Sequence, residues 1–74
     1  MNTVGMIGLG LLGTAIAERL LLAGYGVLGF DVDESRRKAL DSLGGRAADD
    51  ASDVFKQCYT VVLSLPNSDV VAQV

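Results

Sequence analysis

The sequence predicts an α/β protein in which a parallel sheet carries helices on both faces. Short apolar segments that suit buried strands alternate four times with segments of helical periodicity along the 74 residues. Such alternation is typical of strand-helix-strand units joined by right-handed crossovers. Half of the residues are hydrophobic and 20% are charged, which suits a packed core and excludes a disordered chain.

The first predicted strand covers residues 3–8, a mostly apolar run that ends at a glycine. A run that is apolar at alternate and intervening positions alike suits a strand buried on both faces. From Leu11 the apolar residues recur at helical spacing instead, and Gly24 is the expected helix stop. The helix face expected to be buried consists of Leu12, Ile16, Leu20 and Ala23.

A second apolar strand is predicted over residues 26–31, with the acid Asp31 at its carboxyl end. Asp33 can cap the next helix, because its side chain can accept hydrogen bonds from the unpaired N–H groups of the first turn. Two glycines then end that helix. Its basic residues are expected outside and its leucines inside: Arg36, Arg37, Lys38, Leu40 and Leu43, before Gly44 and Gly45.

The second half of the chain continues the alternation. A short strand is predicted over residues 46–48, and Asp49 or Asp50 begins a helix that runs to about Gln57, since acids suit the positive end of a helix dipole. Residues 59–64 give the strongest strand signal in the chain because they are rich in β-branched side chains.

The last predicted element is a helix. Pro66 is expected to end the strand over residues 59–64, because proline cannot donate to a sheet. Asn67 or Ser68 can then cap a helix that continues to Val74.

Charge and composition exclude several classes of function. Six basic residues stand against nine acidic ones, for a net charge of -3, so nucleic acid is not an expected partner. One cysteine and no histidine allow neither an internal disulfide nor a zinc site, and no metal site is predicted. The uncharged start lacks the basic residues of a signal peptide, and no run is long enough to span a membrane. We therefore expect a cytoplasmic protein with a reduced Cys58 and no membrane partner.

Gly8, Gly10 and Gly13 form the pattern G-x-G-x-x-G, between a predicted strand and a predicted helix. In this context the pattern is typical of a dinucleotide site of the Rossmann type. The first glycine permits the tight turn, the second lets a pyrophosphate approach the backbone, and the third lets the helix lie close to the strand. The intervening residues Leu9, Leu11 and Leu12 are therefore also predicted to contact the cofactor. A P-loop is excluded, because no lysine precedes Thr14.

Asp31 lies 23 residues after Gly8, where a dinucleotide site carries the acid that binds the adenosine ribose. A carboxylate there favours NAD and repels the 2′-phosphate of NADP. The neighbouring Val32 supplies no positive charge for such a phosphate. Arg36 and Arg37 are the complication, since a basic pair in the next helix could reach a phosphate. We expect NAD as the cofactor, with NADP less favoured.

The chain resembles the β-hydroxyacid dehydrogenases, the family that includes 3-hydroxyisobutyrate dehydrogenase, tartronate semialdehyde reductase and 6-phosphogluconate dehydrogenase. The resemblance covers the whole chain and is carried by residues 4–13, 22–25, 29–31 and 61–67. Two departures, Leu12 for a usual methionine and Tyr59 for a frequent aspartate, leave the subfamily open. The resemblance implies that Leu65 and Pro66 touch the cofactor and that Val70 lies near the adenine.

The same resemblance implies that residues 1–74 are the N-terminal part of a dinucleotide-binding domain with strand order 3-2-1-4. The parent reaction would be hydride transfer between the nicotinamide and a small 3-hydroxy acid. The family's catalytic lysine, asparagine and substrate-binding segment match no residue here, so no catalytic residue is predicted and the chain itself is expected to be inactive. An uncovered fourth strand would favour association into a homo-oligomer. The alternatives are a non-catalytic nucleotide-binding or interaction module, an imine reductase and a 6-phosphogluconate dehydrogenase.

Overall fold

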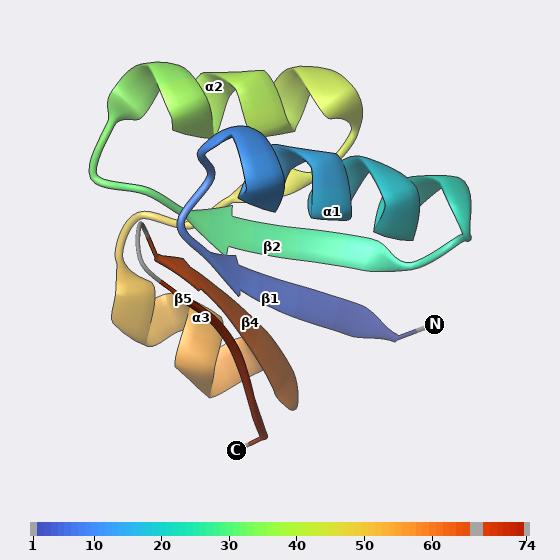
Figure 1. Ribbon diagram of the computed structural model, residues 1–74, viewed down its shortest axis with the longest axis vertical. Coiled ribbons are helices and arrows are strands. Elements are labelled where there is room, and N and C mark those ends of the chain that lie inside the picture. Colours follow the sequence, from blue (N-terminus) through green and yellow to red (C-terminus); the bar gives the residue numbers. More distant parts are fainter. Residues whose placement is uncertain (1, 66–67, 74) are drawn as a thin grey trace.

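The computed structural model describes residues 2–65 and 68–73. Two helices cover one face of a single sheet and the third covers the other face (Figure 1). In chain order the elements are β1 (Thr3–Ile7), α1 (Leu11–Leu22), β2 (Gly26–Phe30), α2 (Glu34–Leu43), β3 (Arg46–Ala47), α3 (Ala51–Gln57), β4 (Thr60–Leu65) and β5 (Ser68–Gln73).

The sheet has the strand order β3-β2-β1-β4-β5. The first four strands in this row are parallel, with β1 at the centre between β2 and β4. The predicted order 3-2-1-4 and the α/β fold class are therefore confirmed. After β3, at one side of the sheet, the chain crosses to the other side of β1 to form β4. The loops that follow β1 and β2 therefore lie at the carboxyl ends of the strands beside this change in strand order, where open α/β sheets bind their ligands.

The predicted last helix is wrong. Residues 68–73 form β5, which runs antiparallel to β4 with Leu65 opposite Ser68 and Thr60 opposite Gln73. The physical reason is that Val70 and Val71 favour extended backbone, and pairing satisfies backbone groups that a helix would leave open along β4.

The expectation that β4 would be an uncovered edge is wrong for the same reason, since β5 lies along it. The homo-oligomer, which was argued from that edge, stays a prediction. The expected strand stop at Pro66, the cap at Asn67 and the end of that helix at Val74 lie outside the described residues.

The caps predicted for α2 and α3 are confirmed. The carboxylate of Asp33 accepts a hydrogen bond from the Ser35 N–H at 2.9 Å, and that of Asp50 accepts one from the Asp53 N–H at 2.9 Å. Gly44 ends α2 with a φ of 102°, in the left-handed region. These contacts fix where both helices begin and where α2 ends.

Protonation of Asp50 should destabilise the chain in acid. The Ser52 hydroxyl and then the Asp53 N–H donate to its carboxylate and lower its pKa below the ordinary value of 3.8. The pKa of Asp50 is thus lower in the folded chain than in the unfolded chain. The stability that its carboxylate adds is therefore fully present above the pKa of the unfolded chain, and it is lost as the pH falls through the pKa of the folded chain. In urea titrations, Asp50→Asn should be less stable than the wild type near neutral pH, and the difference should shrink below about pH 4. A difference that is constant with pH would contradict this.

Two apolar clusters fill the space between the sheet and its helices. The cluster under α1 and α2 consists of Met6, Leu9, Ala17, Val27 and Leu40, and that under α3 of Leu28, Ala48, Val54, Cys58 and Val61. Burial raises the pKa of the Cys58 thiol, so this side chain is a neutral packing group.

The buried face of α1 differs from the one predicted. Gly13 and Ala17 are buried, Ile16 and Leu20 are partly buried, and Leu12 is 52% exposed. The small residues let the helix approach the sheet closely, since a Cβ on Gly13 would overlap the carbonyl oxygen of Gly8. That close approach turns Leu12 outward. The other residues predicted to be inside and found exposed are Ala23 and Leu43.

Candidate functional site

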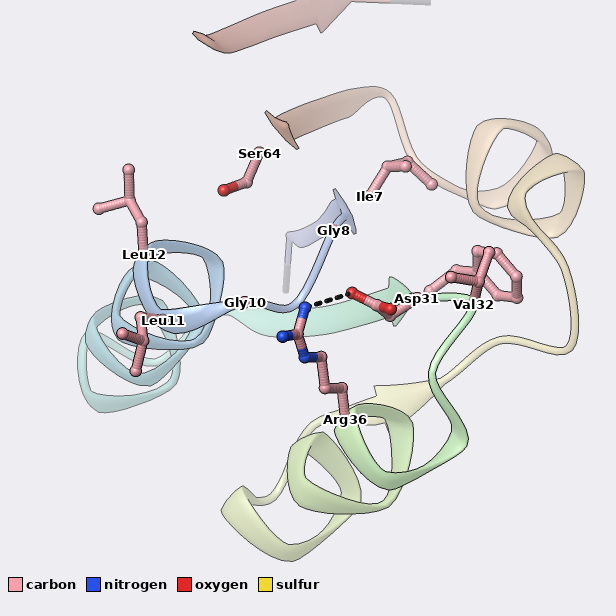
Figure 2. A pocket seen from close by; sticks show the side chains of 10 residues that line it. Ile7, Gly8, Gly10, Leu11, Leu12, Asp31, Val32, Arg36 and Ser64 are labelled. Carbon is pink, nitrogen blue, oxygen red and sulfur yellow. Dashed lines mark ion pairs between the residues drawn. The ribbon is translucent and has the colours of Figure 1, made fainter. Parts of the chain in front are cut away.

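A cavity of about 440 Å³ lies at the carboxyl ends of β1, β2 and β4. Figure 2 shows residues from all three strands and from the first turns of α1 and α2 around it, with Arg36, Asp31 and Ser64 pointing inward. The residues that line it are Ile7, Gly8, Gly10, Leu11, Leu12, Phe30, Asp31, Val32, Arg36 and Ser64.

Gly8 makes the turn that leads from β1 into the cavity. Its φ is 96°, and a Cβ at this position would overlap the carbonyl oxygen of Ser64 in the neighbouring strand. Its N–H donates to the carbonyl oxygen of Phe30 at 2.9 Å. The loop is thus fixed against β4 on one side and β2 on the other, and only glycine fits between them.

Gly10 and the start of α1 leave backbone N–H groups open to the cavity. Gly10 is the N-cap, but no side chain caps the helix and its first turn contains no acid. The N–H groups of the first turn have no acceptor within the helix, as in any α-helix, and here no N-cap side chain supplies one. A Cβ on Gly10 would meet only Nη1 of Arg36, at 3.5 Å. Donors at a helix N-terminus with an unobstructed approach suit an anionic group such as a phosphate.

Asp31 lies against this loop at the border of the cavity and is only 9% exposed. Its Oδ2 accepts a hydrogen bond from the Leu9 N–H at 2.8 Å, and its Oδ1 accepts one from the Asp33 N–H at 2.9 Å. A carboxylate oxygen can accept more than one hydrogen bond. Asp31 can therefore hold two loops together and still accept hydrogen bonds from a ligand.

The two arginines of α2 lie in different surroundings. Arg36 is half-exposed and points toward Gly10 and Asp31 (Figure 2), with its Nη1 3.7 Å from Oδ2 of Asp31. Arg37 instead donates from Nη1 to the carbonyl oxygen of Asp31 at 2.6 Å, with its guanidinium 5.6 Å from the ring centre of Phe30. Only Arg36 of this pair lines the cavity.

Most of the predicted site residues that the structure describes lie in this cavity: Gly8, Gly10, Leu11, Leu12, Asp31 and Val32. Leu9 does not line the cavity, because its side chain is 2% exposed in the core and its N–H donates to Asp31, and its contact with the cofactor stays a prediction. Gly13 packs between helix and strand without lining the cavity.

Two of the residues that the resemblance placed near the cofactor lie in strands. Leu65 ends β4, and Val70 belongs to β5 and pairs with Leu63. Pro66 lies outside the described residues.

The lining residues that sequence reasoning missed are Ile7, Phe30, Arg36 as a cavity residue, and Ser64. Three of them stand at or next to the carboxyl end of a predicted strand, and that position was the available signal. The orientation of Arg36 had no such signal, because it depends on how α2 lies beside the loop before α1.

A family model described as the NAD-binding domain of 6-phosphogluconate dehydrogenase matches residues 3–74. The chain belongs to this family. The predicted resemblance to the β-hydroxyacid dehydrogenases and the predicted Rossmann fold are thereby confirmed, and the chain is an NAD-binding segment.

Named relatives agree with this assignment. The chain is 32% identical over 66 residues to a probable 3-hydroxyisobutyrate dehydrogenase-like protein, designated mitochondrial, of Arabidopsis thaliana, covering 89% of this chain and 22% of that protein. The structure of 3-hydroxyisobutyrate dehydrogenase from Mycobacterium tuberculosis superposes with a TM-score of 0.84 at 27% identity, over 89% of this chain and 23% of that one. An imine reductase from Pseudomonas sp. superposes with a TM-score of 0.79 at 32% identity, over 84% and 22%.

The chain thus spans about a fifth of the length of these relatives. Among the described residues, no helix combines the length and the apolar character needed to cross a membrane.

Proposed function

We propose that residues 1–74 form the N-terminal part of the dinucleotide-binding domain of an NAD-dependent β-hydroxyacid dehydrogenase. The parent enzyme would transfer a hydride between the nicotinamide and a small 3-hydroxy acid, which is the chemistry that the cofactor supplies. The observation that carries the proposal is the uncapped start of α1 behind Gly10, opposite the carboxylate of Asp31 in one cavity.

Each group in the cavity has a proposed role. The N–H groups that follow Gly10 would bind the pyrophosphate, assisted by the positive end of the α1 dipole. Asp31 would accept hydrogen bonds from the adenosine ribose. Val32, which is 88% exposed beside Asp31, would line the adenosine side. Leu65, Pro66 and Val70 are proposed as further cofactor contacts on the family resemblance alone.

Among the described residues, we propose no catalytic group. Lys38 forms an exposed ion pair with Glu34 at 3.3 Å, and Lys56 is exposed on α3, away from the cavity. We expect the chain to bind the dinucleotide without turning over any 3-hydroxy acid. The imine reductase is the second candidate for the parent activity, because its structure superposes over 84% of the chain at 32% identity.

Replacing Gly10 with valine should weaken cofactor binding and leave the fold intact. The backbone of Gly10 has a φ of -72° and a ψ of -164°, which lies next to the extended region and far from the left-handed region that requires glycine, and only the flexible end of Arg36 lies near its Cβ position. The added side chain would stand where the pyrophosphate must approach. Calorimetric titration with NAD should show binding weakened by at least about tenfold, or about 1.4 kcal/mol, with an unchanged unfolding midpoint in urea.

Gly24→Ala is the control for this experiment, because Gly24 has a φ of 95°, which favours glycine, and lies outside the cavity. It should lose stability and keep its affinity for NAD. Wild-type affinity in Gly10→Val would place the dinucleotide elsewhere and overturn the proposed function.

The remaining sequence-based expectations stay predictions. A cytoplasmic location and a homo-oligomer are proposed for the parent protein, with a small-molecule hydroxy acid as its substrate. The name of the Arabidopsis relative includes a mitochondrial location. Expression of a fluorescent fusion of the parent protein would decide between the two compartments.

A further inference from the structure

We infer that Asp31 is a positioning residue for the loop between β1 and α1, in addition to its proposed contact with the ribose. Through the Leu9 N–H it holds the loop whose next residues bind the pyrophosphate. Loss of Asp31 should therefore weaken the binding even of a nucleotide that lacks the ribose hydroxyls. This inference rests on the proposed function, because it concerns the same site.

The contacts that carry the inference join segments far apart in the sequence. Asp31 lies directly after β2, and its Oδ2 accepts a hydrogen bond from the N–H of Leu9, which is the second residue after β1 and lies 22 positions earlier. Its other oxygen holds the Asp33 N–H, at the start of α2. One nearly buried carboxylate thus fixes the two loops that border the cavity relative to each other.

The loop has few alternatives to this contact. The Leu9 side chain is in the core, and the Thr14 hydroxyl donates to the Leu9 carbonyl oxygen at 2.9 Å. The peptide around Leu9 is thereby held from both sides, by α1 and by Asp31. Hydrogen bonds to an ionised acceptor are the stronger kind, and a buried N–H left without a partner is costly. Without Asp31 the loop would have to move to find another acceptor.

Removal of Asp31 should change the affinity for a phosphate group in opposite directions, depending on whether Asp31 positions the loop or acts only through its charge. Removing a negative charge from the side of a phosphate site should strengthen the binding of any phosphate group. Removing the support of the loop should weaken it, because the N–H donors are then no longer preorganised. The direction of the change in affinity therefore distinguishes the two effects.

The test compares wild type, Asp31→Ala and Asp31→Asn by calorimetric titration of the 74-residue chain. The ligand is 2′,3′-dideoxyadenosine diphosphate, which keeps the phosphates and lacks both ribose hydroxyls. We expect Asp31→Ala to bind it about tenfold more weakly than the wild type. Asp31→Asn should recover part of the affinity, because its one amide oxygen can still accept the Leu9 N–H. Equal or tighter binding by both variants would overturn the inference.

Hydrogen exchange of the Leu9 amide gives a readout that is independent of nucleotide binding. This amide should be protected in the ligand-free wild type, unprotected in Asp31→Ala and partly protected in Asp31→Asn, with the core amides of Met6 and Val61 protected throughout. A Leu9 amide that exchanges freely in the folded wild type overturns the inference, even if Asp31→Ala does not fold. A wild type that binds neither NAD nor the dideoxy compound overturns the proposed function instead.

Discussion

Alanine at Gly8 should leave the chain without a stable native state, whereas alanine at Gly24 should cost only about 1–2 kcal/mol. The two glycines have nearly the same backbone, with φ angles of 96° and 95°. They differ in surroundings, because a Cβ on Gly8 would overlap the Ser64 carbonyl oxygen and one on Gly24 would have nothing within 4 Å. The clash at Gly8 is with backbone, so it can be relieved only by separating β4 from the turn.

The difference in the free energy of unfolding between Gly8→Ala and Gly24→Ala therefore measures the cost of a Cβ where the turn after β1 packs against Ser64. A domain of this size has only a few kcal/mol of stability to lose, and we expect Gly8→Ala to cost more than about 4 kcal/mol. Urea unfolding followed by circular dichroism should give a cooperative transition for the wild type and Gly24→Ala, but not for Gly8→Ala. Equal losses at both positions would mean that backbone conformation alone sets the requirement for glycine.

The wild-type site should bind NAD at least about tenfold more tightly than NADP, a difference of about 1.4 kcal/mol. Asp31 is nearly buried beside the proposed ribose position, where its charge would repel a 2′-phosphate with little screening. Arg36 is half-exposed and lies 3.7 Å from that carboxylate, so solvent and Asp31 itself weaken its attraction for a phosphate. Arg37 is bound to the backbone of Asp31 and the ring of Phe30.

Asp31→Asn combined with Val32→Arg should shift the preference toward NADP. The double variant removes the repelling charge and places a guanidinium at an exposed position beside the proposed ribose site. Affinity for both cofactors should also fall, because asparagine cannot accept from both loops as the carboxylate does. The measurement is the ratio of the two dissociation constants for the chain, and the ratio of kcat/KM for the parent enzyme.

Lys38→Ala is the matched control for Arg36→Ala, since each removes one positive charge from α2 and Lys38 is paired with Glu34 outside the cavity. Neither should change the preference for NAD by more than about threefold, which is less than 1 kcal/mol. A wild type that favours NADP tenfold, with the preference lost in Arg36→Ala, would assign cofactor choice to Arg36 instead of Asp31.

The sequence by itself determined the parts of this molecule that depend on neighbouring residues. Apolar runs ending at Gly8 and Asp31 placed β1 and β2, because side-chain periodicity follows directly from strand and helix geometry. The caps at Asp33 and Asp50 were equally local, since each side chain bonds an N–H within three positions of itself. The spacing of Gly8, Gly10 and Gly13 located the cavity, because glycines at these positions allow the tight turn after a strand and the close packing of the following helix.

Tertiary structure alone decided what depends on partners distant in the sequence. Residues 68–73 form a strand because β4 offers them a pairing edge. The local preference of Val70 and Val71 for extended backbone agrees with this strand, but it does not supply the partner. Leu12 faces outward because Gly13 brings α1 close to the sheet. Asp31 could be assigned to a ribose from its position, but its hydrogen bond to Leu9 crosses 22 positions and exists only where two parallel strands end side by side.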